Sequence, residues 1–107
     1  MEIEKLPDYA TESTDGTSFH GDVVYTTVEI LREAFGDPTM IDEDVNEKVQ
    51  YEWCLELSDG TPCTLYDWKE YRCYEETATI EFHIGAHGST DSLKALGAIK
   101  QKIKKVL

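Results

Sequence analysis

The feature that most constrains the fold is an alternating stretch from Lys48 to Leu57, followed by an Asp-Gly pair. Apolar and polar residues alternate along it with a period of two, which is typical of a strand with one buried face. Asp59-Gly60 then favours a two-residue hairpin turn, because such turns require positive φ angles that Asp and Gly accept. The stretch therefore predicts an antiparallel hairpin. The residues on its apolar side are Val49, Tyr51, Trp53, Leu55 and Leu57.

A two-residue turn also fixes which residues of the hairpin face one another. Trp53 would lie opposite Tyr66. One pair further along, Tyr51 would lie opposite Trp68. The prediction is a cluster of four aromatic side chains on one face of the sheet, where such cross-strand pairs stabilise it.

A strand and a helix are predicted before the hairpin. Strand-forming residues run from Phe19 to Tyr25. The segment from Thr26 to Glu29 fits a capping box that begins a helix. Gly36 is placed to end this helix with a left-handed cap, and Pro38 prevents its continuation. The apolar stripe of the helix consists of Val28, Leu31 and Phe35, with Ile30 and Ala34 beside it.

A third strand and a second helix are predicted after the hairpin. Alternation from Thr79 to Ile84 indicates a strand, and a helical period runs from Ser89 or Thr90 to the end of the chain. Lysines in its last turn suit the helix dipole. The predicted apolar stripe of this helix is Leu93, Leu96, Ile99, Ile103 and Val106 or Leu107.

Together these elements predict an α+β fold, an antiparallel meander of three to four strands with two helices packed on one face. Residues 19–107 would form this single domain. Residues 1–18 are polar and rich in turn residues, so they are predicted to be a flexible arm or a short edge segment. The oligomeric state is open, because part of the last helix's stripe could face a second copy.

The charge of the chain is strongly negative and unevenly distributed. Twenty-two acids against ten bases give −12, which argues against direct binding to nucleic acid or to an anionic membrane. Residues 1–90 hold 21 acids and five bases, whereas residues 91–107 hold Asp91 and five lysines. Most of the surface should therefore be negative, and one face of the last helix positive.

The absence of two further signals bears on the location of the chain. No apolar run approaches the ~20 residues that a membrane span requires, and residues 1–5 lack the apolar core of a signal peptide. The expected location is cytoplasmic. Three cysteines without a C-x-x-C pair, namely Cys54, Cys63 and Cys73, are then expected to be reduced.

One acidic segment lies between the first helix and the hairpin. It lacks the regularly spaced acids and the glycine bend of a calcium loop, so it is interpreted as a solvated loop. A small protein with this charge can present carboxylates to a basic cleft, as a competitor of nucleic acid would. The candidate partner surface consists of Asp42, Glu43, Asp44 and Glu47.

A second candidate site is the glycine-rich corner between the third strand and the last helix. Free amides at the start of a helix favour an anion, although the spacing is not that of a P-loop. Under the alternative interpretation the glycines only permit the turn, and Ser89 or Thr90 caps the helix. The residues of this candidate anion or nucleotide site are Tyr66, Trp68, Lys69, His83, His87, Gly88, Ser89 and Thr90.

The sequence offers two places to look for a catalytic site, a polar sheet face and a nucleophile motif. The hairpin register places Glu52 opposite Asp67 on the outward face, beside Glu81 and His83, where a metal could bind. A solvated polar face is the favoured interpretation, so no metal and no cofactor is predicted. No nucleophile motif is present, so the chain is predicted not to be an enzyme.

The order of five short motifs resembles a family of small uncharacterised proteins of bacteriophages and other large DNA viruses. The family pattern is FG-x-P, EW before a DG turn, (I/L)-Y-D-W-K and W-H-I-G-G-(H/S), and the likeness covers about residues 19–98. This chain has Phe82 and Ala86 where tryptophan and glycine are common. The motifs are Phe35-Gly36-Asp37-Pro38, Lys48 to Trp53, Asp59-Gly60-Thr61, Leu65-Tyr66-Asp67-Trp68-Lys69 and His83 to Gly88.

The resemblance implies a viral origin and a location in the cytoplasm of a host cell, and it carries no catalytic residues over to this chain. The expected function is that of a non-enzymatic accessory protein that binds and inhibits a host defence factor through its acidic surface. The alternative is a module that sequesters a nucleotide or signalling phosphate at the Gly85–Thr90 corner.

Overall fold

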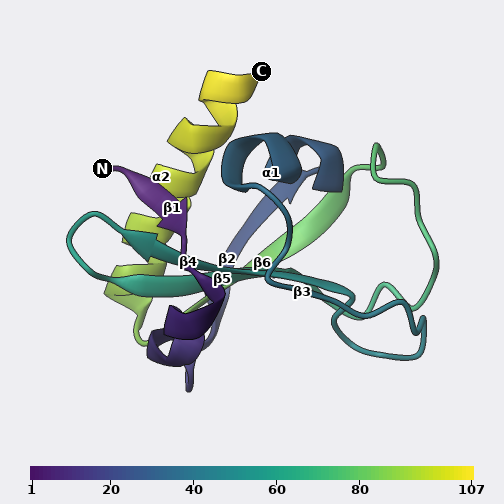
Figure 1. Cartoon of the computed structure of the whole chain (residues 1–107), viewed down its shortest axis with the longest axis horizontal. Helices are drawn as coiled ribbons and strands as arrows, with labels where there is room; N and C mark the ends of the chain where they lie inside the picture. The colour runs from purple at the N-terminus through teal and green to yellow at the C-terminus, as the bar shows by residue number, and fades with distance from the viewer.

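The computed structural model describes residues 1–107 and has an antiparallel sheet as its central layer (Figure 1). Its strands are β1 (Ile3–Lys5), β2 (Ser18–Thr26), β3 (Met40–Ile41), β4 (Tyr51–Leu57), β5 (Pro62–Asp67) and β6 (Ile80–Ala86). The strand order is β1-β4-β5-β6-β2, with β3 paired to the same edge of β4 as β1. The helices are the 3₁₀ helix η1 (Asp8–Thr14), α1 (Val28–Phe35) and α2 (Ser89–Val106). The predicted α+β class is confirmed, with six strands in place of three or four.

The hydrophobic core lies between one face of the sheet and the helices α1 and α2. In Figure 1, α1 and η1 lie on opposite sides of the sheet. Trp53 of β4 and Phe82 of β6 are both 0% exposed and meet edge to face, 6.2 Å between ring centroids. Burying a side chain of this size contributes about 2–3 kcal/mol. Alternate residues of β4, β5 and β6 supply eight of the 18 residues of the core cluster, and α1 and α2 supply eight more.

The helix boundaries follow from local capping chemistry. Thr27 caps α1, since its hydroxyl accepts a hydrogen bond from the Ile30 amide at 3.0 Å. Gly36 ends α1 at φ +85°, but its ψ of −164° places it outside the left-handed helical region. In α2 the buried residues are Ser92, Ala95, Ala98, Ile99 and Ile103, whereas Leu93 and Leu107 are exposed. The predicted stripe of α2 is thus wrong at Leu93, whereas at the other end Val106, and not Leu107, packs against the core.

Residues 1–18 form structure and are not a flexible arm. β1 pairs with β4 at the edge of the sheet, as the alternative prediction of an edge segment had it. Ile3 and Leu6 are buried, and Ile3 belongs to the core cluster. η1 then covers part of the open face of the sheet, where the Thr14 hydroxyl contacts the Cys54 sulfur at 3.5 Å. The domain therefore includes the N-terminal segment.

The hairpin register is one residue away from the predicted one. The loop between β4 and β5 has three residues, Ser58 to Gly60, because the Leu57 amide donates to the Thr61 carbonyl at 2.9 Å. Trp53 accordingly pairs with Leu65, and Tyr66 pairs with Glu52. A shift of one residue moves every side chain of a strand to the other face. The predicted cluster of four aromatics is therefore wrong.

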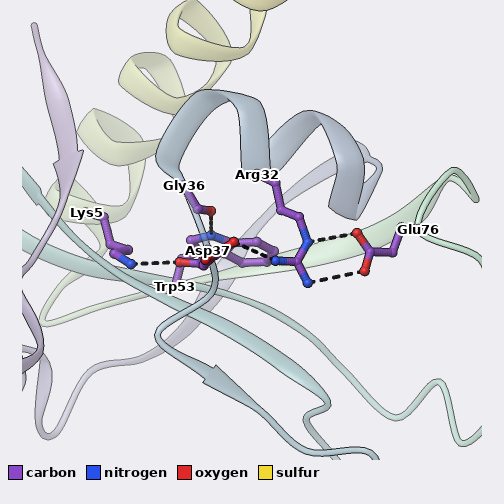
Figure 2. A network of polar contacts seen from close by, with 6 residues as sticks. All are labelled: Lys5, Arg32, Gly36, Asp37, Trp53 and Glu76. Atoms are coloured by element: carbon purple, nitrogen blue, oxygen red, sulfur yellow. Dashed lines mark hydrogen bonds and ion pairs between the residues drawn. The ribbon is translucent and has the colours of Figure 1, made fainter.

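The end of α1 is fixed by a polar network (Figure 2). The Arg32 guanidinium contacts both carboxylate oxygens of Glu76, at 2.8 and 3.2 Å, and the Asp37 carboxylate at 2.8 Å. Lys5 donates to the Asp37 carbonyl at 2.9 Å, and the Trp53 indole donates to the Gly36 carbonyl at 3.0 Å. The network joins α1 to β1, β4 and the segment before β6.

Candidate functional site

Two loops lie side by side at one end of the sheet and define what we call the acidic end, residues 42–50 and 68–79 (Figure 1). The Lys69 amide donates to the Lys48 carbonyl at 2.7 Å. The Gln50 side chain donates to the Arg72 carbonyl at 3.1 Å. Within these ranges the chain has seven acids and three bases. The loops that follow β3 and β5 therefore form one negative surface.

The predicted acidic residues are four of the five acids of this end that form no ion pair, the fifth being Glu75. The carboxylates of Asp37, Glu70 and Glu76 contact arginines. Asp42, Glu43, Asp44 and Glu47 form no ion pair. Backbone amides two residues on donate to Asp42 and Asp44, which keeps the loop turned with its charge outward. These four side chains are available to a cationic partner.

Aromatic side chains continue this surface onto the open face of the sheet. Phe19 of β2 stacks on His83 of β6 with ring centroids 4.1 Å apart. His83 also stacks with Trp68, at 6.2 Å, and Tyr66 lies edge-on to Trp68 at 6.1 Å. We call Phe19, Tyr66, Trp68 and His83 the aromatic row. Phe19 and Trp68 are 44% and 38% exposed, so the row presents ring surface to solvent where the acidic end begins.

The geometry around Trp68 favours cations. The Lys69 ammonium lies 5.5 Å from the centroid of the Trp68 ring, a cation–π contact. Lys69 and Tyr71 adopt positive φ angles of 53° and 49°, which non-glycine residues seldom do. Tyr71, three residues after Trp68, is 48% exposed. Two aromatic rings and five carboxylates without an ion pair thus belong to one end of the molecule.

Burial changes the acidity of two side chains on the open face. Glu52 and Tyr66 are neighbours across β4 and β5. Burial raises the pKa of the Glu52 carboxyl above its ordinary 4.5. Burial, and then the nearby Glu52 charge, raises the pKa of the Tyr66 phenol above 10.0. The Glu52 carboxyl forms no ion pair. The Tyr66 end of the aromatic row therefore lies next to a half-buried acidic group.

Asp67 does not belong to this face, so the predicted pairing of Glu52 with Asp67 on the outward face is wrong. It is 0% exposed and faces the core. One carboxylate oxygen accepts from the amides of Gln50 and Tyr51, at 2.8 and 2.9 Å, and the other accepts from the Tyr74 hydroxyl at 3.0 Å. Asp67 therefore ties both loops of the acidic end to β5. No group of three or more His, Cys, Asp or Glu side chains in the chain is arranged to hold a metal ion.

The predicted anion or nucleotide site is divided between two places. Trp68 lies next to the Tyr66–His83 pair, on the side toward the first residues of β6. Gly88 lies after the other end of β6, five residues beyond His83, which is about 16 Å along an extended chain. Tyr66, Trp68, Lys69 and His83 are thus together, and His87, Gly88, Ser89 and Thr90 form a separate group.

The separate group at the start of α2 has its own internal contacts. Gly88 is the N-cap residue and no side chain caps the helix, so Ser89 and Thr90 do not cap it as the alternative interpretation proposed. The His87 ring contacts the Ser13 carbonyl at 2.9 Å. The His83 ring contacts the Glu81 carboxylate at 3.1 Å. Both histidines therefore already have polar partners.

The three cysteines are free thiols. Cys54 and Cys63 are buried and Cys73 is exposed. Burial raises the pKa of the Cys63 thiol from 9.0 to about 12, which keeps it protonated at neutral pH.

Comparison with protein-family models and with curated proteins found no match for this chain. None of its helices combines the length and the apolar composition that crossing a membrane requires.

Sequence reasoning missed Phe19 and Tyr71 as surface residues. For Phe19 the signal was Gly21, which has a φ of +99° and lies in a register shift of β2 between Phe19 and Val23.

Proposed function

We propose that this chain is a non-enzymatic protein that binds a basic partner through the acidic end and the adjoining aromatic row. The observation that carries the proposal is the set of four unpaired carboxylates beside exposed aromatic rings. Carboxylates and aromatic faces both favour lysine and arginine side chains. A protein that normally binds nucleic acid has a surface rich in lysine and arginine side chains.

The biological role we propose is inhibition of a host defence factor by occupying its basic cleft. The resemblance to proteins of bacteriophages and large DNA viruses supports a host partner. The net charge of −12 supports a competitor of nucleic acid over a protein that itself binds nucleic acid. Trp68, partly desolvated at the centre of the surface, is the side chain we expect to anchor the complex.

The test is affinity capture from an extract of the host, followed by elution with increasing salt. Wild-type protein should retain a basic, nucleic-acid-handling protein that is released as salt rises, because screening weakens exposed charge pairs. The variant Asp42→Asn/Glu43→Gln/Asp44→Asn/Glu47→Gln should not retain it. Trp68→Ala should retain less of it at every salt concentration.

The matched control removes four exposed acids from elsewhere on the molecule. Glu4, Glu12, Glu33 and Glu56 are exposed and form no ion pair. Their fourfold Gln variant has the same net charge as the acidic-end variant and should capture the partner as wild type does. Equal loss in both variants would mean that net charge alone, and not the acidic end, carries the binding.

The alternative function is sequestration of a nucleotide or signalling phosphate at the Gly85–Thr90 corner. It would use the start of α2 together with His87, Gly88, Ser89 and Thr90, and Trp68, which lies beyond Tyr66 toward the start of β6, would not stack on the ligand. It predicts that an added nucleotide raises the melting temperature of the protein. An unchanged melting temperature at millimolar nucleotide would remove this alternative.

A further inference from the structure

A groove of about 560 Å³ lies between β2 and the C-terminal half of α2, on residues that belong neither to the acidic end nor to the aromatic row. β2 is the last strand of the sheet, so one side of its backbone has no strand partner. Val24 of β2 and Ile103 and Leu107 of α2 provide its apolar walls, and the backbone of β2 at Val23 and Tyr25 borders it. The groove therefore combines a free strand edge with apolar side chains on both sides.

The exposure of the walls shows that this chain does not cover the groove itself. Leu107 is 80% exposed, whereas Val24 and Ile103 are 5% and 9% exposed and belong to the core. After the register shift of β2, the residues from Val23 to Thr26 pair regularly with β6. A regular strand edge next to a hydrophobic floor is the arrangement that proteins use to accept an additional strand.

The charge of the groove differs from that of the rest of the molecule. Its charged side chains are Lys100 and Lys104, in a chain whose net charge is −12. Neither lysine forms an ion pair. Two free ammonium groups on the rim of an apolar groove select for an occupant with carboxylates.

We propose that the groove is a docking site for an extended acidic segment of a partner protein, which adds to the sheet as a strand beside β2. Backbone hydrogen bonds to β2 supply affinity, and alternate side chains of the segment enter the groove. Of these, apolar side chains contact Ile103 and Leu107, and acidic side chains pair with Lys100 and Lys104.

A second copy of this chain does not suit the groove as well. Paired edge to edge, the other copy would present its own β2. The acidic residue of β2 is Asp22, whose carboxylate accepts a hydrogen bond from the Ser92 hydroxyl at 2.7 Å. A second copy would thus bring no free acid to Lys100 and Lys104. This argument favours a different, acidic partner.

The test uses a defined probe, the fluorescein-labelled peptide Val-Thr-Glu-Thr-Val-Thr-Glu-Thr, and measures fluorescence anisotropy with the full chain. In a strand this peptide presents Val and Glu alternately on one face. We expect a Kd on the order of 100 μM. The peptide with Lys in place of both Glu residues should bind at least about tenfold more weakly, because it brings like charges to the groove.

Two comparisons separate strand addition at this groove from general electrostatic attraction. Lys100→Glu/Lys104→Glu should weaken binding about tenfold, and Lys102→Glu/Lys105→Glu, on the same helix with the same charge change, should not. Methylating one alternate set of peptide amides should abolish binding, and methylating the other set should not, because alternate amides point toward the neighbouring strand. Equal effects within either pair, or no binding at about 1 mM, would overturn the proposal. A protein that sediments as a dimer closed through β2 would overturn it too.

Discussion

At the scale of single residues, Asp67 is the buried charge on which the acidic end depends. Its carboxylate accepts three hydrogen bonds, two from the amides that begin β4 and one from Tyr74. Buried polar groups are tolerated when they are fully hydrogen-bonded. Asp67 therefore acts as a structural anchor beneath the surface loops.

We expect Asp67→Asn to lower the free energy of unfolding by about 2 kcal/mol, because hydrogen bonds to charged groups are worth about 1.5–3 kcal/mol and an amide nitrogen cannot accept one. Urea unfolding at neutral pH measures this change. Asp15→Asn is the control, since Asp15 is exposed and its carboxylate makes no ion pair. Equal stability of the two variants would contradict an anchoring role.

Gly85 marks the tightest approach on the open face. A Cβ added there would clash with the Thr64 hydroxyl and would lie 3.4 Å from both the Thr17 hydroxyl and the Tyr66 ring. We expect Gly85→Ala to lower the free energy of unfolding by about 1–3 kcal/mol, as overpacking does. Adding Thr64→Ala should recover most of the loss, in a thermal or urea double-mutant cycle.

Gly97 provides the opposite case. It lies in α2, and a Cβ added there would meet nothing within 4 Å. Gly97→Ala should raise the free energy of unfolding by about 0.5–1 kcal/mol, because alanine loses less backbone entropy in a helix. If Gly85→Ala behaved like Gly97→Ala, the close packing of Thr64 on β6 would be wrong.

At the scale of elements, the features that depend on neighbours in sequence were predictable. Alternation in β4 and β6 and the capping threonine of α1 each predict an element close to its observed bounds. The hairpin register was not predictable, because Asp59-Gly60 fits both a two-residue turn and the last two positions of a three-residue loop. This difference of one residue in the length of the loop decides which residues of β5 lie on the same face of the sheet as Trp53.

The composition of the candidate site was less predictable than its elements. Asp67 follows a strand of alternating residues, and only its contacts with the start of β4 and with Tyr74 show why it is buried. The His83–Gly88 motif looks compact in sequence, yet most of it is extended strand. An extended strand separates its ends by about 3.3 Å per residue, so the motif cannot gather its residues at one ligand.

The connector from β5 to β6 should respond to alkaline pH through Tyr74. Burial, and then Asp67, raises the pKa of the Tyr74 phenol above its ordinary 10.0. Above pH 10 the unfolded chain loses this proton while the folded chain keeps it, so stability falls as pH rises. Cys63, with its pKa raised to about 12, adds a loss that begins near pH 9.

We therefore expect the free energy of unfolding of Tyr74→Phe to fall less steeply between pH 9 and 11 than that of wild type, because proton binding is linked to unfolding in this pH window. Urea unfolding at a series of pH values measures the difference. At pH 7 it should be less stable by about 1 kcal/mol, for the lost hydrogen bond to Asp67. Tyr9→Phe is the control, because Tyr9 is 88% exposed. An unchanged slope for Tyr74→Phe would contradict the burial of the phenol.

At the scale of the whole molecule, the acidic end and the groove beside α2 carry side chains of opposite charge. Lys94 contacts Asp59 at 2.8 Å, beside the β4–β5 loop. The acidic end lies at the other end of the same two strands (Figure 1). The molecule has a negative surface with aromatic rings and a separate groove with two lysines, to which we assign a basic partner and an acidic segment as proposals. Because the two surfaces share no residues, variants of one should leave the other intact.

The most direct test of the acidic end is the association rate with the captured partner, measured by surface plasmon resonance over a range of salt. Wild type and the fourfold variant of Glu4, Glu12, Glu33 and Glu56 should show the same steep fall in rate with salt. The fourfold variant of Asp42, Glu43, Asp44 and Glu47 should associate about tenfold more slowly at low salt and depend on salt only weakly. If both fourfold variants had the same rate and the same salt dependence, the acidic end would not be the binding surface.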